Sequence, residues 1–79
     1  MTLADVTPSL LAQVGQALYG PQWQSALARD LGVSDRTMRR WAAASADVPA
    51  RIGADLLVLV QQRGDALAVL AHKLRAGRE

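Results

Sequence analysis

The densest group of side chains with binding chemistry in this sequence is three arginines, Arg36, Arg39 and Arg40. Arg36 and Arg40 are four residues apart, so on a helix they share one face. A guanidinium can donate two parallel hydrogen bonds to O6 and N7 of guanine, and it also binds phosphate. The cluster therefore predicts a nucleic-acid-binding face, and the competing interpretation is a solvated face without a partner.

The arginines belong to a predicted short helix that begins after Ser34. The Ser34 hydroxyl can accept a hydrogen bond from a free N–H group of the first turn, and Asp35 is favourable at the positive end of the helix dipole. Met38 and Trp41 are three residues apart and apolar, so they share a face that the arginines leave free. We interpret Trp41 as a core residue. Trp23 is also expected in the core, with contact to a sugar-phosphate backbone as the alternative.

Two more helices are predicted before this one. Thr7 followed by Pro8 is a start signal, because the hydroxyl can cap the helix and the missing N–H of proline costs nothing in the first turn. Gly20 and Pro21 end the first helix, and Gly32 ends the second. The apolar positions at helical spacing are Leu10, Leu11, Val14 and Leu18 in the first helix and Trp23, Leu27 and Leu31 in the second.

The composition predicts an all-α fold in one domain covering residues 1–79. Phenylalanine is absent and the β-branched residues are scattered singly, which gives strands little to build from. A last helical segment is expected over residues 50–75, with a helix from about Ala50 to Leu74 that is roughly 37 Å long. Gly64 and Asp65 could divide it, so the sequence leaves open five helices or four with a long last helix.

Residues 24–43 combine a helix, a tight turn and a second helix with small Ala28 at the expected crossing and Gly32 in the turn. The inward positions carry no charge: Leu27, Leu31, Val33, Met38 and Trp41. The segment SALARDLGVSDRTMRRW resembles the helix-turn-helix of the phage repressor and Cro-like transcriptional regulators. The resemblance covers this motif closely and the five-helix layout of that family loosely.

The resemblance implies that residues 34–41 form a recognition helix that enters the major groove of double-stranded DNA. Asp35, Arg36 and Arg40 would then face the groove. Four further residues would hold the DNA backbone: Gln24, Ser34, Thr37 and Arg39. For Asp35 we prefer a structural role at the start of the helix, and the alternative is a hydrogen bond from cytosine N4.

The last predicted helix carries a second feature, an apolar seam with a four-three spacing that Arg63 interrupts. The predicted dimer interface along this seam consists of Leu56, Val60, Arg63, Leu67, Leu70 and Leu74. We favour self-association as a two-fold dimer, and the alternative is that the helix folds back over its own core. A dimer would place two recognition helices about 34 Å apart on DNA.

These features predict a homodimeric transcriptional repressor of phage or mobile-element type, acting on a palindromic operator and possibly on its own operon. The alternative function is a helical protein-interaction module, such as an antitoxin or an adaptor. The operator sequence and the choice between repression and activation are left open.

Other classes are excluded by what the sequence lacks. There is no cysteine, and His72 is the single histidine, so neither a disulfide nor a metal site is expected. No Ser-His-Asp set, paired carboxylates or glycine-rich phosphate loop is visible, which argues against an enzyme and against a cofactor. Apolar runs such as residues 56–60 are far shorter than the roughly 18 residues needed to span a membrane. We therefore expect a cytoplasmic protein.

Overall fold

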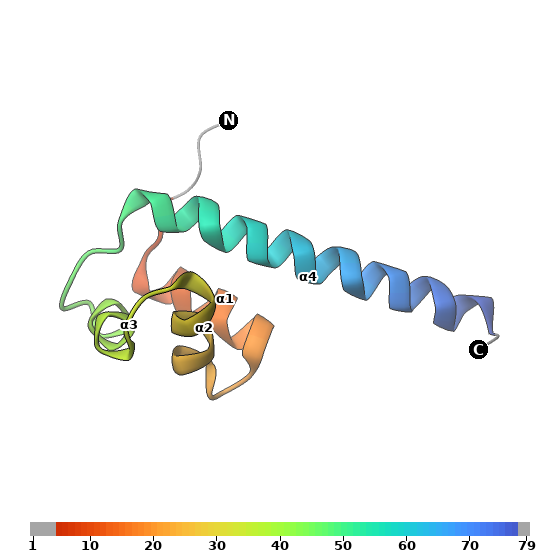
Figure 1. Ribbon diagram of the computed structural model, residues 1–79, viewed down its shortest axis with the longest axis horizontal. Helices are drawn as coiled ribbons and strands as arrows, with labels where there is room; N and C mark the ends of the chain where they lie inside the picture. The colour runs from red at the N-terminus through yellow and green to blue at the C-terminus, as the bar shows by residue number, and fades with distance from the viewer. Residues whose placement is uncertain (1–4, 78–79) are drawn as a thin grey trace.

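The computed structural model describes residues 5–77, and this part of the chain is all-helical, without a strand. The elements are α1 (Pro8–Tyr19), α2 (Trp23–Leu31), α3 (Asp35–Ala42) and α4 (Ala50–Ala76). The first three helices pack together under one end of α4, and the other end of α4 extends past them (Figure 1). The predicted all-α class is confirmed, while the outer limits of the predicted domain, 1 and 79, lie outside the described residues.

The ends of α1 and α2 are set by local chemistry, as the sequence predicts. Thr7 Oγ1 accepts a hydrogen bond from the Leu10 N–H at 3.1 Å, and Pro8 occupies the first turn. Gly32 ends α2 in the left-handed conformation, with φ of 74°. The N–H of Val33 then bonds the Ala28 carbonyl at 3.0 Å, so the turn between α2 and α3 closes on the last turn of α2.

The carboxyl end of α3 uses the same kind of closure, but with an alanine in the left-handed position. Ala44 has a φ of 61°, a conformation in which the Cβ crowds the following carbonyl. The Ser45 N–H bonds the Arg40 carbonyl at 2.8 Å, and the Ala44 N–H bonds the Trp41 carbonyl at 3.1 Å. This closure satisfies the last carbonyls of α3 and turns the chain toward α4.

α4 is one continuous helix of 27 residues, about 40 Å long. The expectation of five helices is therefore wrong, and the alternative of four with a long last helix is observed. Gly64 lies inside α4 rather than at a break. A single glycine costs a helix only about 1 kcal/mol, which does not outweigh the hydrogen bonds of the turns on both sides.

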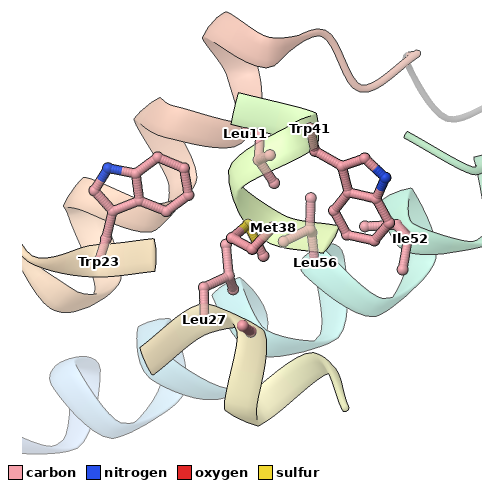
Figure 2. Close-up of a cluster of buried hydrophobic side chains, with 8 residues drawn as sticks. Leu11, Trp23, Leu27, Met38, Trp41, Ile52 and Leu56 are labelled. Carbon is pink, nitrogen blue, oxygen red and sulfur yellow. The ribbon is translucent and has the colours of Figure 1, made fainter. Parts of the chain in front are cut away.

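One apolar core joins all four helices, and Figure 2 shows its side chains converging between them. Its buried members are Leu11, Trp23, Leu27, Ala28, Met38, Trp41, Ile52 and Leu56. Both tryptophans belong to this core, so their interpretation as packing residues is confirmed. Ala28 is 1% exposed at the contact between α2 and α3, where the sequence predicted a small residue.

The overall dimensions show that the core covers only part of the chain. The Cα radius of gyration is 14.6 Å and the longest dimension is 49 Å. A compact domain of this length would have a radius of gyration of about 12 Å. The excess comes from α4, whose residues 61–76 are all exposed except the half-buried Ala71. The first half of α4 thus belongs to the core, and the second half projects from it (Figure 1).

Candidate nucleic-acid interface

The residues that α3 buries in the core show which of its sides faces outward. Met38 is fully buried and Trp41 is 4% exposed, so the core holds this helix along one side. Arg36 and Arg40 lie two residues before and two residues after Met38, about 160 to 200° around the helix from it. Both are exposed. The structure therefore places the two arginines together on the side of α3 that faces away from the core.

The start of α3 is held by two hydroxyl groups that also belong to the predicted site. Ser34 Oγ accepts a hydrogen bond from the Thr37 N–H at 3.0 Å and donates one to Thr37 Oγ1, also at 3.0 Å. This is the cap that the sequence predicted for Ser34. Contacts of Ser34 and Thr37 with a DNA backbone stay a prediction.

Arg39 and Asp35 occupy a flank of α3 that faces the amino end of α2. Together with the first residues of α2 they line a hollow of about 360 Å³. Its other lining residues are Pro21, Gln22, Trp23, Gln24 and Ser25. The structure thus brings the predicted backbone-contacting residues Gln24 and Arg39 to one place. Asp35 lies with them rather than on the Arg36 and Arg40 face.

The electrostatics of this hollow favour an anion. Within the described chain, no side chain caps the amino end of α2, and its first turn holds no acidic residue. Free N–H groups and the positive end of the helix dipole are therefore available there. The exposed guanidinium of Arg39 adds a full positive charge beside them, partly offset by the carboxylate of Asp35. A phosphate group is the anion that such helix ends commonly bind.

A polar cluster that the sequence analysis missed connects α1, α2 and α4. The Tyr19 hydroxyl donates a hydrogen bond to Asp30 Oδ2. Arg63 Nη1 donates to the Leu18 carbonyl oxygen at 2.9 Å, and its guanidinium carbon lies 5.8 Å from the centre of the Tyr19 ring. Burial, followed by the bond to Asp30 and its charge, raises the pKa of Tyr19 to about 12. No local signal marks this cluster, because its members are far apart in the sequence.

This cluster changes the interpretation of the predicted dimer seam. Arg63, which the sequence analysis placed on the seam, is turned toward α1. Leu56 is 4% exposed and belongs to the core of its own chain, so it does not lie on a free surface. The other four predicted residues are exposed: Val60 by 42%, Leu67 by 56%, Leu70 by 53% and Leu74 by 77%. The alternative, in which the last helix folds back over its own core, thus holds for the first half of α4 only.

Neither a metal site nor a membrane span is found among the described residues. Within residues 5–77, no three His, Cys, Asp or Glu side chains come together in a way that could hold a metal ion. Of the four helices that are described, none combines the length and the apolar character needed to cross a membrane. His72 lies exposed on α4.

Comparisons with protein-family models, with curated proteins and with solved structures find no match to this chain.

Proposed function

We propose that this chain is a sequence-specific double-stranded-DNA-binding protein in which α3 enters the major groove. The observation that carries the proposal is the position of Arg36 and Arg40 on the outer side of a helix whose inner side is held by Met38 and Trp41. A helix fixed in this way presents its guanidinium groups to base edges at a defined orientation. Each bidentate contact with guanine discriminates against a wrong base by about 1 to 3 kcal/mol.

The hollow between α2 and α3 supports the proposal with a second kind of contact. Arg39 and the uncapped amino end of α2 lie beside the base-facing side of α3, where a DNA backbone would pass. Contacts to phosphate set the register of a protein on DNA but carry no sequence information. In this arrangement the bases are contacted by Arg36 and Arg40. The DNA backbone is contacted by Gln24, Ser34, Thr37 and Arg39.

The biological role that fits these contacts is a homodimeric transcriptional repressor of phage or mobile-element type. A two-fold dimer binds a palindromic operator, because each half-site meets one recognition helix. Occupancy of an operator that overlaps a promoter blocks polymerase. The concentration of the protein itself sets this occupancy, which suits an autoregulatory repressor.

Selection of binding sites from random duplex DNA at near-physiological salt tests the proposal. The wild type should enrich a palindromic consensus, and the Arg36→Ala/Arg40→Ala variant should not. The matched control is Arg51→Ala/Lys73→Ala, which removes the same charge from exposed positions of α4 and should retain the consensus. Equal loss in both double variants would mean that net charge alone drives binding, which contradicts base readout by α3.

A helical protein-interaction module is the second candidate function, and the exposed apolar side of α4 is the observation that favours it. The exposed large apolar side chains of the described residues are Leu57, Val58, Val60, Leu67, Val69, Leu70 and Leu74, all of them on α4. If the selection enriched no DNA sequence for the wild type, the DNA-binding proposal would fail and this second function would replace it.

A further inference from the structure

The exposed side of α4 carries a regular apolar pattern that is offset from the seam predicted by sequence. Six positions follow an alternating spacing of three and four residues, and none is charged: Leu57, Val60, Gly64, Leu67, Ala71 and Leu74. These six residues, which we call the α4 seam, fall within about 100° of the helix circumference. The pattern is the heptad repeat of a coiled coil, with Leu57, Gly64 and Ala71 at one kind of position and the other three at the second.

We propose that a second copy of this chain packs on the α4 seam in antiparallel orientation, with Gly64 facing the partner's Leu67. This inference deepens the proposed function, because it rests on the homodimer and specifies its interface. In this register, two residues face each other across the interface when their residue numbers add up to 131. The two-fold axis then passes between Asp65 and Ala66.

The sizes of the seam residues select this orientation. In an antiparallel pair, the two kinds of heptad position meet each other. Gly64 is then opposite the partner's Leu67, and Val60 is opposite the partner's Ala71, so a small residue always receives a larger one. A parallel pair would set Gly64 against its own copy and Ala71 against its own copy, which leaves unfilled space in two layers.

An apolar groove beside the seam fits the same arrangement. A groove of about 200 Å³ runs between α1 and α4 and contacts one end of the seam. Its lining includes Val6, Leu10, Val14, Gly53, Leu57 and Val60. In the antiparallel register the partner's Leu74 lies opposite Leu57, at this groove. Leu74 is 77% exposed, the most exposed large apolar side chain of the described residues, so the groove would cover the side chain that most needs burial.

The seam exposes large apolar side chains that a dimer could bury. Leu57 is exposed by 40%, Val60 by 42%, Leu67 by 56% and Leu74 by 77%. A specific protein interface buries at least about 1,000 Å² in total, or about 500 Å² per chain. The exposed apolar residues extend along α4 from the groove at α1 to the last turn of the helix. Exposed apolar patches of several hundred Å² mark interaction sites on soluble proteins.

The antiparallel register also gives a spacing that suits two half-sites on DNA. Ile52 and Leu56 anchor α4 in the core. At 1.5 Å per residue, the two copies of Ile52 would lie about 40 Å apart along the helix pair and the two copies of Leu56 about 29 Å apart. These values bracket the roughly 34 Å between major grooves one turn apart on the same side of DNA. A parallel pair would place both cores at the same level along α4.

A matched pair of substitutions tests whether the seam forms the interface. Leu67 and Val69 are both 56% exposed, but only Leu67 lies on the seam. Leu67→Glu should raise the dimer dissociation constant by about 100-fold or more, because each dimer then buries two carboxylates in place of two leucines. Val69→Glu should leave it unchanged. Sedimentation equilibrium over a range of concentrations measures both, and circular dichroism checks that the helices persist.

Cysteine cross-linking tests the orientation and still gives a result if Leu67→Glu does not fold. The chain has no cysteine, so Val60→Cys and Ala71→Cys each introduce a single thiol. Mixed and oxidised, the two variants should form a disulfide between unlike chains. Each variant alone should not, because its two thiols would be about 16 Å apart along the helix pair, beyond the reach of a disulfide.

The outcomes separate this inference from the proposed DNA binding, since neither measurement contains DNA. Disulfides between two copies of the same variant would show a parallel pair and overturn the inference. A wild type that stays monomeric would also overturn it, and so would a dimer that Leu67→Glu leaves intact. A dimer with the predicted cross-link that selects no DNA sequence would support the inference and contradict the proposed function. A monomer that still selects a half-site would overturn the inference and the homodimer but support the proposed DNA binding.

Discussion

Gly15 of α1 lies directly against the indole of Trp23 of α2, so close that a Cβ at residue 15 would overlap the ring. Trp23 is 5% exposed and begins α2. The missing side chain of Gly15 therefore lets α1 and α2 approach each other. This contact also sets the position of the amino end of α2, where the candidate phosphate-binding hollow lies.

Gly15→Ala should destabilise the fold, because the new methyl group overpacks the contact with Trp23 at a cost of about 1 to 3 kcal/mol, against a gain of up to about 1 kcal/mol in helix propensity. Gly64→Ala is the matched control, since nothing lies within 4 Å of the added Cβ, and it should stabilise α4 by up to about 1 kcal/mol. Urea unfolding followed by circular dichroism measures both, in the Leu67→Glu background so that dimer contacts do not contribute. Equal effects of the two substitutions would contradict the close packing at Gly15.

The two left-handed residues that flank α3 should respond in opposite directions to exchange of glycine and alanine. Gly32→Ala should cost about 1 kcal/mol, because a Cβ is unfavourable at a φ of 74°. Ala44→Gly should gain about 0.5 to 1 kcal/mol by relieving the same crowding at a φ of 61°. A change of 1 kcal/mol shifts the thermal midpoint of a domain this small by about 4 to 8 °C. If both substitutions moved the thermal midpoint in the same direction, crowding by the Cβ at a left-handed residue would not explain them.

Tyr19 should titrate well above the ordinary range of a tyrosine. Its pKa is raised from 10.0 to about 12 by burial, then by the hydrogen bond to Asp30 and the charge of Asp30, against a smaller opposing effect of Arg63. Tyr19 is the single tyrosine, so phenolate absorbance reports it alone. Because the folded pKa is the higher one, the stability from this group is present below pH 10 and is lost as the pH rises toward 12.

Asp30→Asn should lower the pKa of Tyr19 toward 10, since the substitution removes the negative charge and the carboxylate acceptor. Asp47→Asn, an exposed position in the loop before α4, serves as the control and should leave the titration unchanged. An unchanged titration in the Asp30 variant would show that the bond between α1 and α2 does not form in solution.

Arg39 should contribute to DNA affinity without contributing to sequence preference. Arg39→Gln should weaken binding to all sequences alike and reduce the slope of log affinity against log salt by about one, because one phosphate contact is lost. Arg36→Ala should instead relax the preference at one base position, at a cost of about 1 to 3 kcal/mol. Affinities measured at several salt concentrations for specific and mismatched duplexes distinguish the two. If Arg39→Gln instead changed the preference at one base position, Arg39 would be a base contact and not a phosphate contact.

The sequence alone determined the features that depend on neighbours within a few residues. The cap at Ser34 and the left-handed turn at Gly32 follow from the chemistry of single residues and adjacent N–H groups. The separation of Met38 from Arg36 and Arg40 follows from helical periodicity, which assigns each residue a side of the helix before any packing occurs. The side of α3 that carries Arg36 and Arg40 was therefore predictable from the sequence, whereas the place of Asp35 beside Gln24 and Arg39 was not.

Only the tertiary structure decided which side of α4 is covered. Helical periodicity groups Leu56 with Val60 and Arg63, but it does not say where along the helix the core ends. The bond from Arg63 to the Leu18 carbonyl spans 45 residues, and such a long-range contact leaves no local pattern. Packing of Ile52 and Leu56 in the core fixes the rotation of α4 and leaves Leu57 40% exposed, and the bond from Arg63 to α1 accompanies this rotation. The exposed seam is offset from the predicted one because α1 and α2 cover the side on which the predicted seam began.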